Sequence, residues 1–238
     1  MKKVVILLTW KRLKSLDDSL KNLLRQRDQD FDVHISNGNL AKDAVKSVEL
    51  SASTYAEKGL RIKVSHDGNK YSCFRRFFIA KEYAEAGYDV VFFLDDDIVI
   101  PRFYINQMMK QFRPGHYHSC YTWTFKKNPQ SYWNDRTRVM DNSTGIRYGG
   151  AGVSMSDAKI FLDKRLFNVI SKEAYEIDDL WISYYCNHIL NKPIIYTNIK
   201  DLRIGGTDTA ALYRKFKRAE VDRKSQFLQK LISAGWDL

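Results

Sequence analysis

The sequence predicts an α/β fold, in which a mixed, mostly parallel sheet flanked by helices forms a single domain of 238 residues. The first observation behind this prediction is that strand and helix patterns alternate along the first 100 residues, which is typical of a parallel sheet. The second is that 44% of the residues are hydrophobic, enough for one substantial core. The third is that polar segments follow the predicted strands, and ligands of such sheets bind beyond the carboxyl ends of the strands.

The first half of the chain is the more regular one. Its predicted strands are residues 4–8, 32–36, 62–64 and 90–94. Its predicted helices are residues 13–24, with leucines at helical spacing, and residues 71–86, with Gly87 as a stop. The segments at the strand ends are 9–12, 37–39, 67–69 and 95–97. We expect one crevice at the carboxyl edge of the sheet to collect them.

The second half is less regular. We expect a helix over 103–112, an aromatic-rich strand over 117–125, a long polar loop over 126–147 and a helix from near Ser156. Trp133 is the lone apolar anchor of the polar loop, and long loops without regular structure are usually functional or disordered. A basic helix is predicted over 210–233.

Three consecutive carboxylates, Asp95–Asp97, emerge from the buried run 90–94. They repel one another, and their pKa values rise unless a cation neutralises them. Carboxylate oxygens suit Mg²⁺ or Mn²⁺, which use one or two protein carboxylates and fill their other positions with water and substrate phosphates. The run therefore predicts a divalent-cation site acting on a phosphate ester.

Two further motifs each have two interpretations. The segment 148–155 carries Gly149, Gly150 and Gly152, which either let backbone closely approach a ligand or another chain segment, or form a tight turn. Asp178 and Asp179 precede an apolar helix, and acids at such a place ordinarily complement the helix dipole. On spacing alone we prefer that explanation, and the alternative is a general base that projects into the crevice.

The formal charge of +11 permits nucleic acid, an anionic membrane or a phosphorylated small molecule as a partner. No apolar segment approaches the ~20 residues of a membrane span, and the apolar start is too short for a signal peptide, so we expect a cytoplasmic protein. The three cysteines are widely spaced and predict reduced thiols. For the basic helix we prefer packing on the domain to docking on an anionic membrane.

In their order, these segments resemble the GT-A class of nucleotide-sugar-dependent glycosyltransferases, and among them the small bacterial or large-DNA-virus type. The segments that carry the resemblance are LLTWKR, HISNGN, VVFFLDDDIVIP, YGGAGVSM and EIDDLWISYY, within residues 3–190. FLDDD matches the DXD motif of the class. DDLW resembles the acidic motif that supplies the base in inverting members.

The resemblance implies a Rossmann-like GT-A domain with residues 1–100 as the nucleotide-binding half and 101–200 as the acceptor-side half. Residues 201–238 would be a C-terminal loop and a basic helix. The implied reaction is metal-dependent transfer of a sugar from a nucleoside-diphosphate sugar, UDP-linked, to a hydroxyl of a glycan or glycolipid, with inversion. The implied cofactor is Mn²⁺ or Mg²⁺, contact with an anionic membrane would be peripheral, and no nucleic acid is expected.

The resemblance also implies roles for individual residues. Asp97 would bind the metal directly, Asp95 would bind it or the ribose, and Asp96 would support either task. The base would be Asp179, with Asp178 as its rival. The other implied contacts are Thr9, Arg12 and Asn37 at the nucleotide, Arg76 in preference to Arg75 near the nucleotide, and Gly150 at the sugar.

Some features depart from the resemblance. Asn37 stands where many members have an Asp that contacts the base, and either arginine also has an ordinary explanation as part of a solvated helix face. No histidine follows His188, so a third protein ligand would have to be Asp208, for which an ordinary turn is the preferred explanation. Two other classes stay open, a metal-dependent nucleotidyltransferase or phosphoesterase and a nucleic-acid-binding module.

Overall fold

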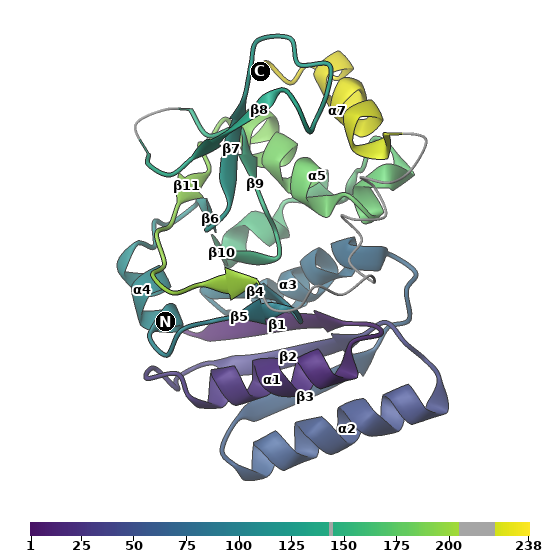
Figure 1. The fold of residues 1–238 in the computed structure, drawn as a ribbon, viewed down its shortest axis with the longest axis vertical. Helices are drawn as coiled ribbons and strands as arrows, with labels where there is room; N and C mark the ends of the chain where they lie inside the picture. The colour runs from purple at the N-terminus through teal and green to yellow at the C-terminus, as the bar shows by residue number, and fades with distance from the viewer. Residues whose placement is uncertain (143–144, 205–221) are drawn as a thin grey trace.

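A seven-stranded mixed sheet, in the order β11-β6-β10-β4-β1-β2-β3, lies at the centre of the computed structural model, which describes residues 1–142, 145–204 and 222–238 (Figure 1). The strands are β1 (Lys3–Thr9), β2 (Asp32–Asn37), β3 (Arg61–His66), β4 (Val90–Asp95), β6 (Tyr117–Ser119), β10 (Val153–Asp157) and β11 (Ile195–Tyr196). The pairs β4-β1, β1-β2, β2-β3 and β11-β6 are parallel, whereas β10 runs antiparallel to β4 and β6. The predicted mixed, mostly parallel sheet is confirmed.

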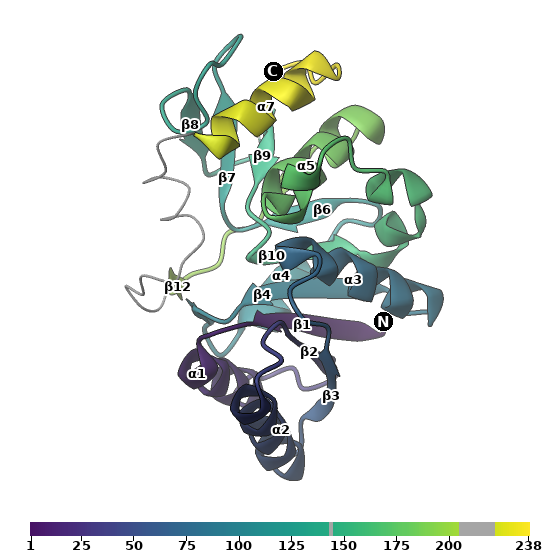
Figure 2. The same ribbon diagram turned by 90° about the vertical axis from the view of Figure 1, so that its right-hand side faces the viewer.

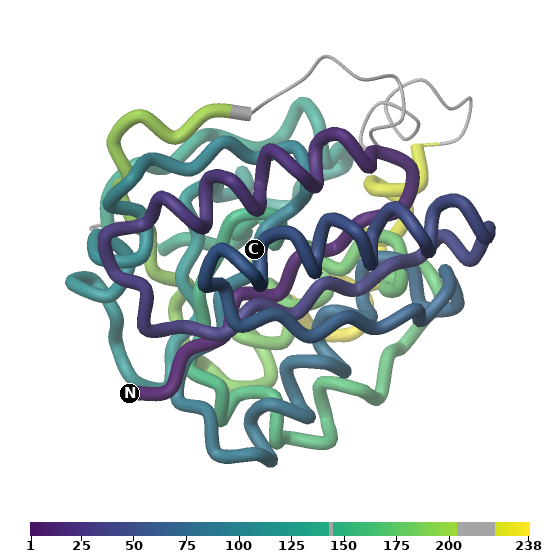
Figure 3. The backbone as a smooth tube through the Cα atoms, turned by 90° about the horizontal axis from the view of Figure 1, so that it is seen from below, coloured from purple at the N-terminus to yellow at the C-terminus, as the bar shows by residue number. Residues whose placement is uncertain are grey.

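Apolar cores cover both faces of this sheet. Successive side chains of β1 point to opposite sides, so they enter different cores. Val5 and Leu7 belong to one apolar core, and Ile6 belongs to the other. The first core includes residues of α1 (Leu13–Leu24), α2 (Lys42–Glu57) and α4 (Tyr104–Lys110). The second includes residues of α3 (Arg75–Glu85), α5 (Asp178–Tyr184) and α7 (Arg223–Ser233). Figure 3 shows α1 and α2 side by side on their face.

Two small sheets complete the strand structure. One has the order β8-β7-β9 and consists of β7 (Thr122–Phe125), β8 (Arg136–Val139) and β9 (Tyr148–Gly149). The other pairs β12 (Arg203–Ile204) with β5 (Ile98–Val99). Figure 2 shows the three-stranded sheet, α5 and α7 on one side of the large sheet, with α1 and α2 on the other. The side with the three-stranded sheet also carries the acidic motif at the start of α5.

Several sequence predictions need correction. The strand predicted over 117–125 is two strands in different sheets, because the Ser119 hydroxyl accepts the N–H of Tyr121 and turns the chain between them. The loop predicted over 126–147 contains β8, and α2 lies where we predicted no helix. The helix predicted from Ser156 is a 3₁₀ helix, Ala158–Leu162, that follows β10. The other short helices are the 3₁₀ helices Ser72–Phe74, Lys164–Phe167 and Lys172–Tyr175 and the π-helix Tyr185–Ile189, which continues α5.

Of the basic helix predicted over 210–233, the structure describes only the part that forms α7. The turn 205–209, which contains Asp208, lies outside the described residues. Phe227, Leu228 and Leu231 of α7 are fully buried in the core, so α7 packs on the domain, as we preferred. Within the described ranges, no helix has the length and apolar character to cross a membrane. Contact with a membrane surface stays a prediction.

Candidate active site

The carboxylate run lies where the order of the strands reverses. β4 pairs with one edge of β1 and β2 pairs with the other, with Leu8 opposite Asp95. Segments that leave adjacent parallel strands at such a point diverge and leave a crevice between them. The loop after β1 and the run Asp95–Asp97 meet there, as the sequence predicted.

Arg12, in the loop after β1, pairs with two members of the run. Its Nη2 lies 2.5 Å from Asp96 Oδ1 and its Nη1 lies 2.6 Å from Asp97 Oδ2. Burial nevertheless raises the pKa of Asp96 to about 7, against the effect of Arg12. Burial and the charge of Asp95 also raise the pKa of Asp97. A further cation beside the run would lower these pKa values and keep the carboxylates ionised.

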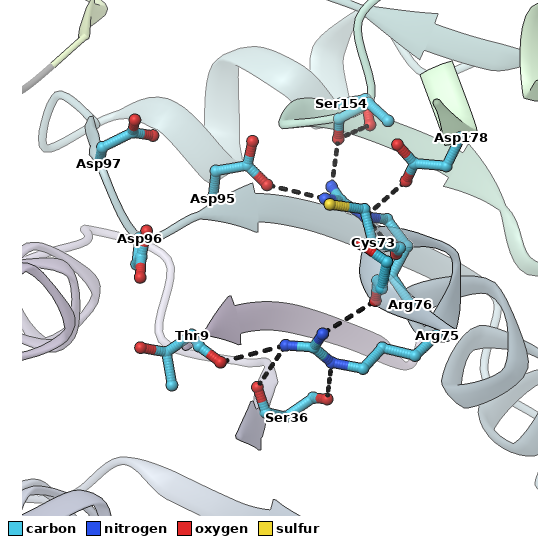
Figure 4. Close-up of polar contacts among 12 residues, drawn as sticks. Thr9, Ser36, Cys73, Arg75, Arg76, Asp95, Asp96, Asp97, Ser154 and Asp178 are labelled. Carbon is cyan, nitrogen blue, oxygen red and sulfur yellow. Dashed lines mark hydrogen bonds and ion pairs between the residues drawn. The ribbon is translucent and has the colours of Figure 1, made fainter. Parts of the chain in front are cut away.

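The residues of the run fit a hard divalent cation. Asp95 and Asp97 would supply oxygen ligands, since their side chains are 38% and 19% exposed. Figure 4 shows the three carboxylates pointing in different directions. Throughout the described part of the chain, no three His, Cys, Asp or Glu side chains converge as a metal site. A Mg²⁺ or Mn²⁺ ion here would use one or two carboxylates and take its remaining ligands from water and phosphate.

Arg76 connects the run to the acidic motif of α5. Its Nη2 donates to Asp95 Oδ1 at 2.8 Å, and its Nε lies 3.0 Å from Asp178 Oδ2 (Figure 4). Its Nη1 donates to the carbonyl of Ala151 in the glycine segment at 3.0 Å. The residue is only 2% exposed, so the solvated helix face is ruled out as its explanation. One guanidinium thus holds together three motifs that are far apart in the sequence.

Arg75 is also buried but binds only neutral acceptors. Its Nε donates to the Ser36 hydroxyl at 2.8 Å, and its Nη2 donates to the carbonyl of Thr9 at 3.1 Å (Figure 4). A Cβ atom on Gly38 would lie 3.1 Å from this Nη2, so glycine makes room for the guanidinium. Burial lowers the pKa of Arg75. Arg75 therefore fixes the carboxyl ends of β1 and β2, including Thr9.

Asn37 is fully buried at the end of β2 and engaged within its own loop. Its Nδ2 donates to the carbonyl of Asn39 at 2.8 Å, and its Oδ1 accepts the N–H of Asn39 at 2.9 Å. A second contact of Nδ2 reaches His66 Nδ1 at 3.1 Å. Asn37 thus orders the loop at the carboxyl end of β2.

The glycine segment makes room for Asp95. A Cβ atom on Gly152 would lie 2.1 Å from Asp95 Oδ2, closer than atoms pack, and Asp95 N–H donates to the Gly152 carbonyl at 2.8 Å. A Cβ atom on Gly150 would lie at an ordinary 3.5 Å from Tyr121. Gly152 is therefore required by a close approach to a site carboxylate.

The two acids of α5 have different surroundings. Asp178 is 5% exposed, and burial raises its pKa to about 7, with Arg76 opposing the shift. Asp179 is also desolvated, but Lys224 at 2.9 Å and the Tyr148 hydroxyl, which donates to it, hold its pKa below the usual range. Asp178 is thus enclosed beside Arg76, whereas Asp179 is an ionised carboxylate beside the three-stranded sheet.

Sequence reasoning did not find Lys224 or Tyr148. Lys224 lies 45 positions from Asp179, on α7, and it reads as one of many basic residues in that segment. Tyr148 stands directly before the glycines, and this position is the signal from which its place at the site could have been predicted.

Comparison with known families decides the class of this protein. Residues 4–170 match the pattern of the family described as Glycosyl transferase family 2. This chain belongs to that family. The resemblance found in the sequence is confirmed by this match, since the family is one of glycosyl transferases. Among curated proteins, none matches the sequence significantly.

Solved structures with a similar fold support the GT-A architecture of this family 2 member. The mannosyltransferase PcManGT from Pyrobaculum calidifontis, in complex with GDP-Man and Mn²⁺, is 14% identical with a TM-score of 0.68, over 99% of this chain and 65% of that one. S. aureus TarS 1–349 in complex with UDP is 16% identical with a TM-score of 0.55, over 98% of this chain and 71% of that one. An active-site mutant of LgtC is 13% identical with a TM-score of 0.56, over 97% of this chain and 95% of that one. This chain thus spans less than two thirds of the mannosyltransferase, 65% of its length.

Proposed function

We propose that this glycosyltransferase moves a sugar from a nucleoside-diphosphate sugar, UDP-linked, to a hydroxyl of a glycan or glycolipid, with inversion and with Mn²⁺ or Mg²⁺ as cofactor. The observation that carries the proposal is the contact of Arg76 with both Asp95 and Asp178. It brings the acidic motif of α5 next to the carboxylate run. The complexes of PcManGT with GDP-Man and Mn²⁺ and of TarS with UDP support a nucleotide donor and a metal.

On the donor side, Asp97 and Asp95 would hold the cation, and Asp96 would keep the run in place. The cation, when bound, neutralises charge on the departing nucleoside diphosphate. Arg12 is a bidentate donor already placed at the run, and its guanidinium suits a phosphate as well as a carboxylate. Thr9 and the loop that Asn37 orders would border the nucleoside.

On the acceptor side, Asp179 would take the proton of the acceptor hydroxyl. It is the more exposed of the two acids, with 18% of its side chain exposed against 8% for Asp178. The acceptor oxygen bonds to the anomeric carbon while the bond from that carbon to the diphosphate oxygen breaks, and the electron pair leaves with the diphosphate. The hydroxyl proton becomes strongly acidic as the new bond forms, so an ionised carboxylate of low pKa can accept it.

The glycine segment would lie under the donor sugar. Gly150 makes no close contact that requires glycine, so its lack of a side chain leaves space at the crevice. Gly152 supports the same region by holding Asp95 in place.

A panel of nucleotide sugars with Mn²⁺ tests the proposal, with release of nucleoside diphosphate as the readout and NMR of the product for the anomeric configuration. We expect inversion. Asp179→Asn should bind the diphosphate normally and lose transfer, whereas Asp18→Asn, on the exposed side of α1, should behave like the parent. Retention of configuration, or parental transfer by Asp179→Asn, would contradict the mechanism.

A further inference from the structure

One face of the three-stranded sheet carries arginines stacked with aromatic rings. Trp123 of β7 pairs with Arg138 of β8 on one side and with Tyr148 of β9 on the other. Directly opposed residues share a face of a sheet, and residues two apart on a strand do so too. Arg136 therefore lies on this face with Arg138. We call Tyr121, Trp123, Trp133, Arg136 and Arg138 the arginine–aromatic cluster.

The cluster is a continuous stack. The guanidinium carbon of Arg138 lies 4.7 Å from the ring centroids of both Tyr121 and Trp123. The guanidinium carbon of Arg136 lies 4.8 Å from the Trp123 centroid and 5.3 Å from that of Trp133. Each member is partly exposed. Planar guanidinium groups and indole rings are thus held in fixed positions that a ligand can reach.

The two arginines of the cluster lack anionic partners. Arg138 donates to the carbonyl of Cys120 at 2.9 Å, and Arg136 donates to the Tyr132 hydroxyl at 2.5 Å. Among the residues that the structure describes, no carboxylate lies within ion-pair distance of either one. Burial lowers the pKa of Arg138, and the charge of Arg136 lowers it further. Two arginines that stack on one indole without a carboxylate partner favour an anion as their ligand.

The cluster adjoins the acidic motif and the glycine segment. The ring centroids of Trp123 and Tyr148 are 5.1 Å apart, and the Tyr148 hydroxyl donates to Asp179. At the other end, the carbonyl of Tyr121 accepts the N–H of Gly150 at 2.8 Å. A ligand lying on the cluster would therefore extend toward both Asp179 and the glycines.

We propose that the arginine–aromatic cluster is the acceptor subsite, and that the acceptor is an anionic glycan with a phosphate or carboxylate group close to the accepting sugar. This inference rests on the proposed function, with Asp179 as the base. Arg136 and Arg138 bind the anionic group through paired N–H donors, and the sugar beside it contacts the exposed parts of the aromatic rings. Phosphate and carboxylate share this chemistry, so the probes must separate them.

The test uses the full chain with bound UDP and Mn²⁺ and follows tryptophan fluorescence during titration. The probes are glucose 6-phosphate, glucuronate, the neutral methyl glucoside and a ten-nucleotide poly(dT). We expect at least one of the two anionic sugars to bind about tenfold more tightly than methyl glucoside, and the tighter of them identifies the acceptor group. Equal binding of the neutral glycoside would overturn the inference. So would a preference for poly(dT) with steep salt dependence, which indicates a nucleic-acid site.

Variants separate this inference from the proposed function. Arg136→Gln and Arg138→Gln should each weaken the anionic sugar about fivefold or more, and Arg138→Lys should restore only part of the loss because it keeps charge without the planar group. The matched control is Arg61→Gln, an exposed arginine on β3 at the far edge of the large sheet. Affinity for UDP with Mn²⁺ should stay parental in all four variants. Parental sugar binding in the cluster variants overturns this inference alone, whereas a parent that binds no nucleoside diphosphate overturns the proposed function.

Discussion

Substitution of Gly152 by alanine should damage the site while leaving the fold intact. The new Cβ atom would lie 2.1 Å from Asp95 Oδ2 and 2.7 Å from its Cγ. The backbone of Gly152 is outside the left-handed region, so alanine adds no backbone strain. The carboxylate must therefore move by about 1 Å, since Cβ contacts below 3.0 Å essentially do not occur. This movement breaks the 2.8 Å bond from Arg76.

A misplacement of about 1 Å at a reacting centre costs about 100-fold in rate, or about 2.7 kcal/mol of transition-state stabilisation. The free energy of unfolding should change by less than about 1 kcal/mol, because Asp95 is 38% exposed and a partly exposed ion pair contributes little. The assays are kcat/KM with the best donor from the panel and urea denaturation. The matched control is Gly145→Ala, whose Cβ atom would have only Arg147 Nε near it, at 3.9 Å. Parental kcat/KM in Gly152→Ala would refute the reasoning.

The remaining predictions concern the buried charges around this site. Arg76→Gln should lower the free energy of unfolding by about 3 kcal/mol or more, chiefly because it leaves buried Asp178 without its cation; parental urea stability would contradict this. Lys224→Met should cost a similar amount by leaving Asp179 unpaired, and an unchanged urea midpoint would show that α7 does not depend on this pair. Activity should fall as pH drops through the pKa of the base, which must be deprotonated. With Asp179 as the base, the acid limb of kcat/KM lies below the usual pKa range of an aspartate; because the pKa of Asp96 is also about 7, a limb near pH 7 assigns the role to Asp178 only if it persists in Asp96→Asn.

Much of the nucleotide-side half could be predicted because its signals are local. Strand β1 is one apolar run, α1 repeats leucine at helical spacing, and the carboxylates follow β4 directly. We did not predict α2 because its buried residues, Ala44, Val48, Ala52 and Tyr55, have helical spacing but include two alanines, so the apolar stripe is weak. The division of 117–125 into two strands was not predicted because both strands continue one aromatic-rich pattern.

The motifs of the site could be found from the sequence, but their partners could not. Three carboxylates and two further acids are visible as runs, whereas the bridge through Arg76 depends on how α3 packs against β4 and α5. The sequence predicted that the glycines let backbone approach a ligand or another chain segment, or form a tight turn, but only the folded structure identifies the partner of Gly152 as Asp95, at the end of β4. Lys224 comes from a helix at the end of the chain, so only the folded structure brings it to Asp179.

Calorimetric titration of the full chain with nucleoside diphosphates, with and without Mn²⁺, tests the central claim most directly. We expect one diphosphate to bind tightly only when Mn²⁺ is present, and Asp97→Ala to lose this metal-dependent binding while keeping the parental fold by circular dichroism. Equal affinity with and without Mn²⁺, or parental metal-dependent binding by Asp97→Ala, would contradict the claim that the carboxylate run after β4 binds a sugar nucleotide through a cation.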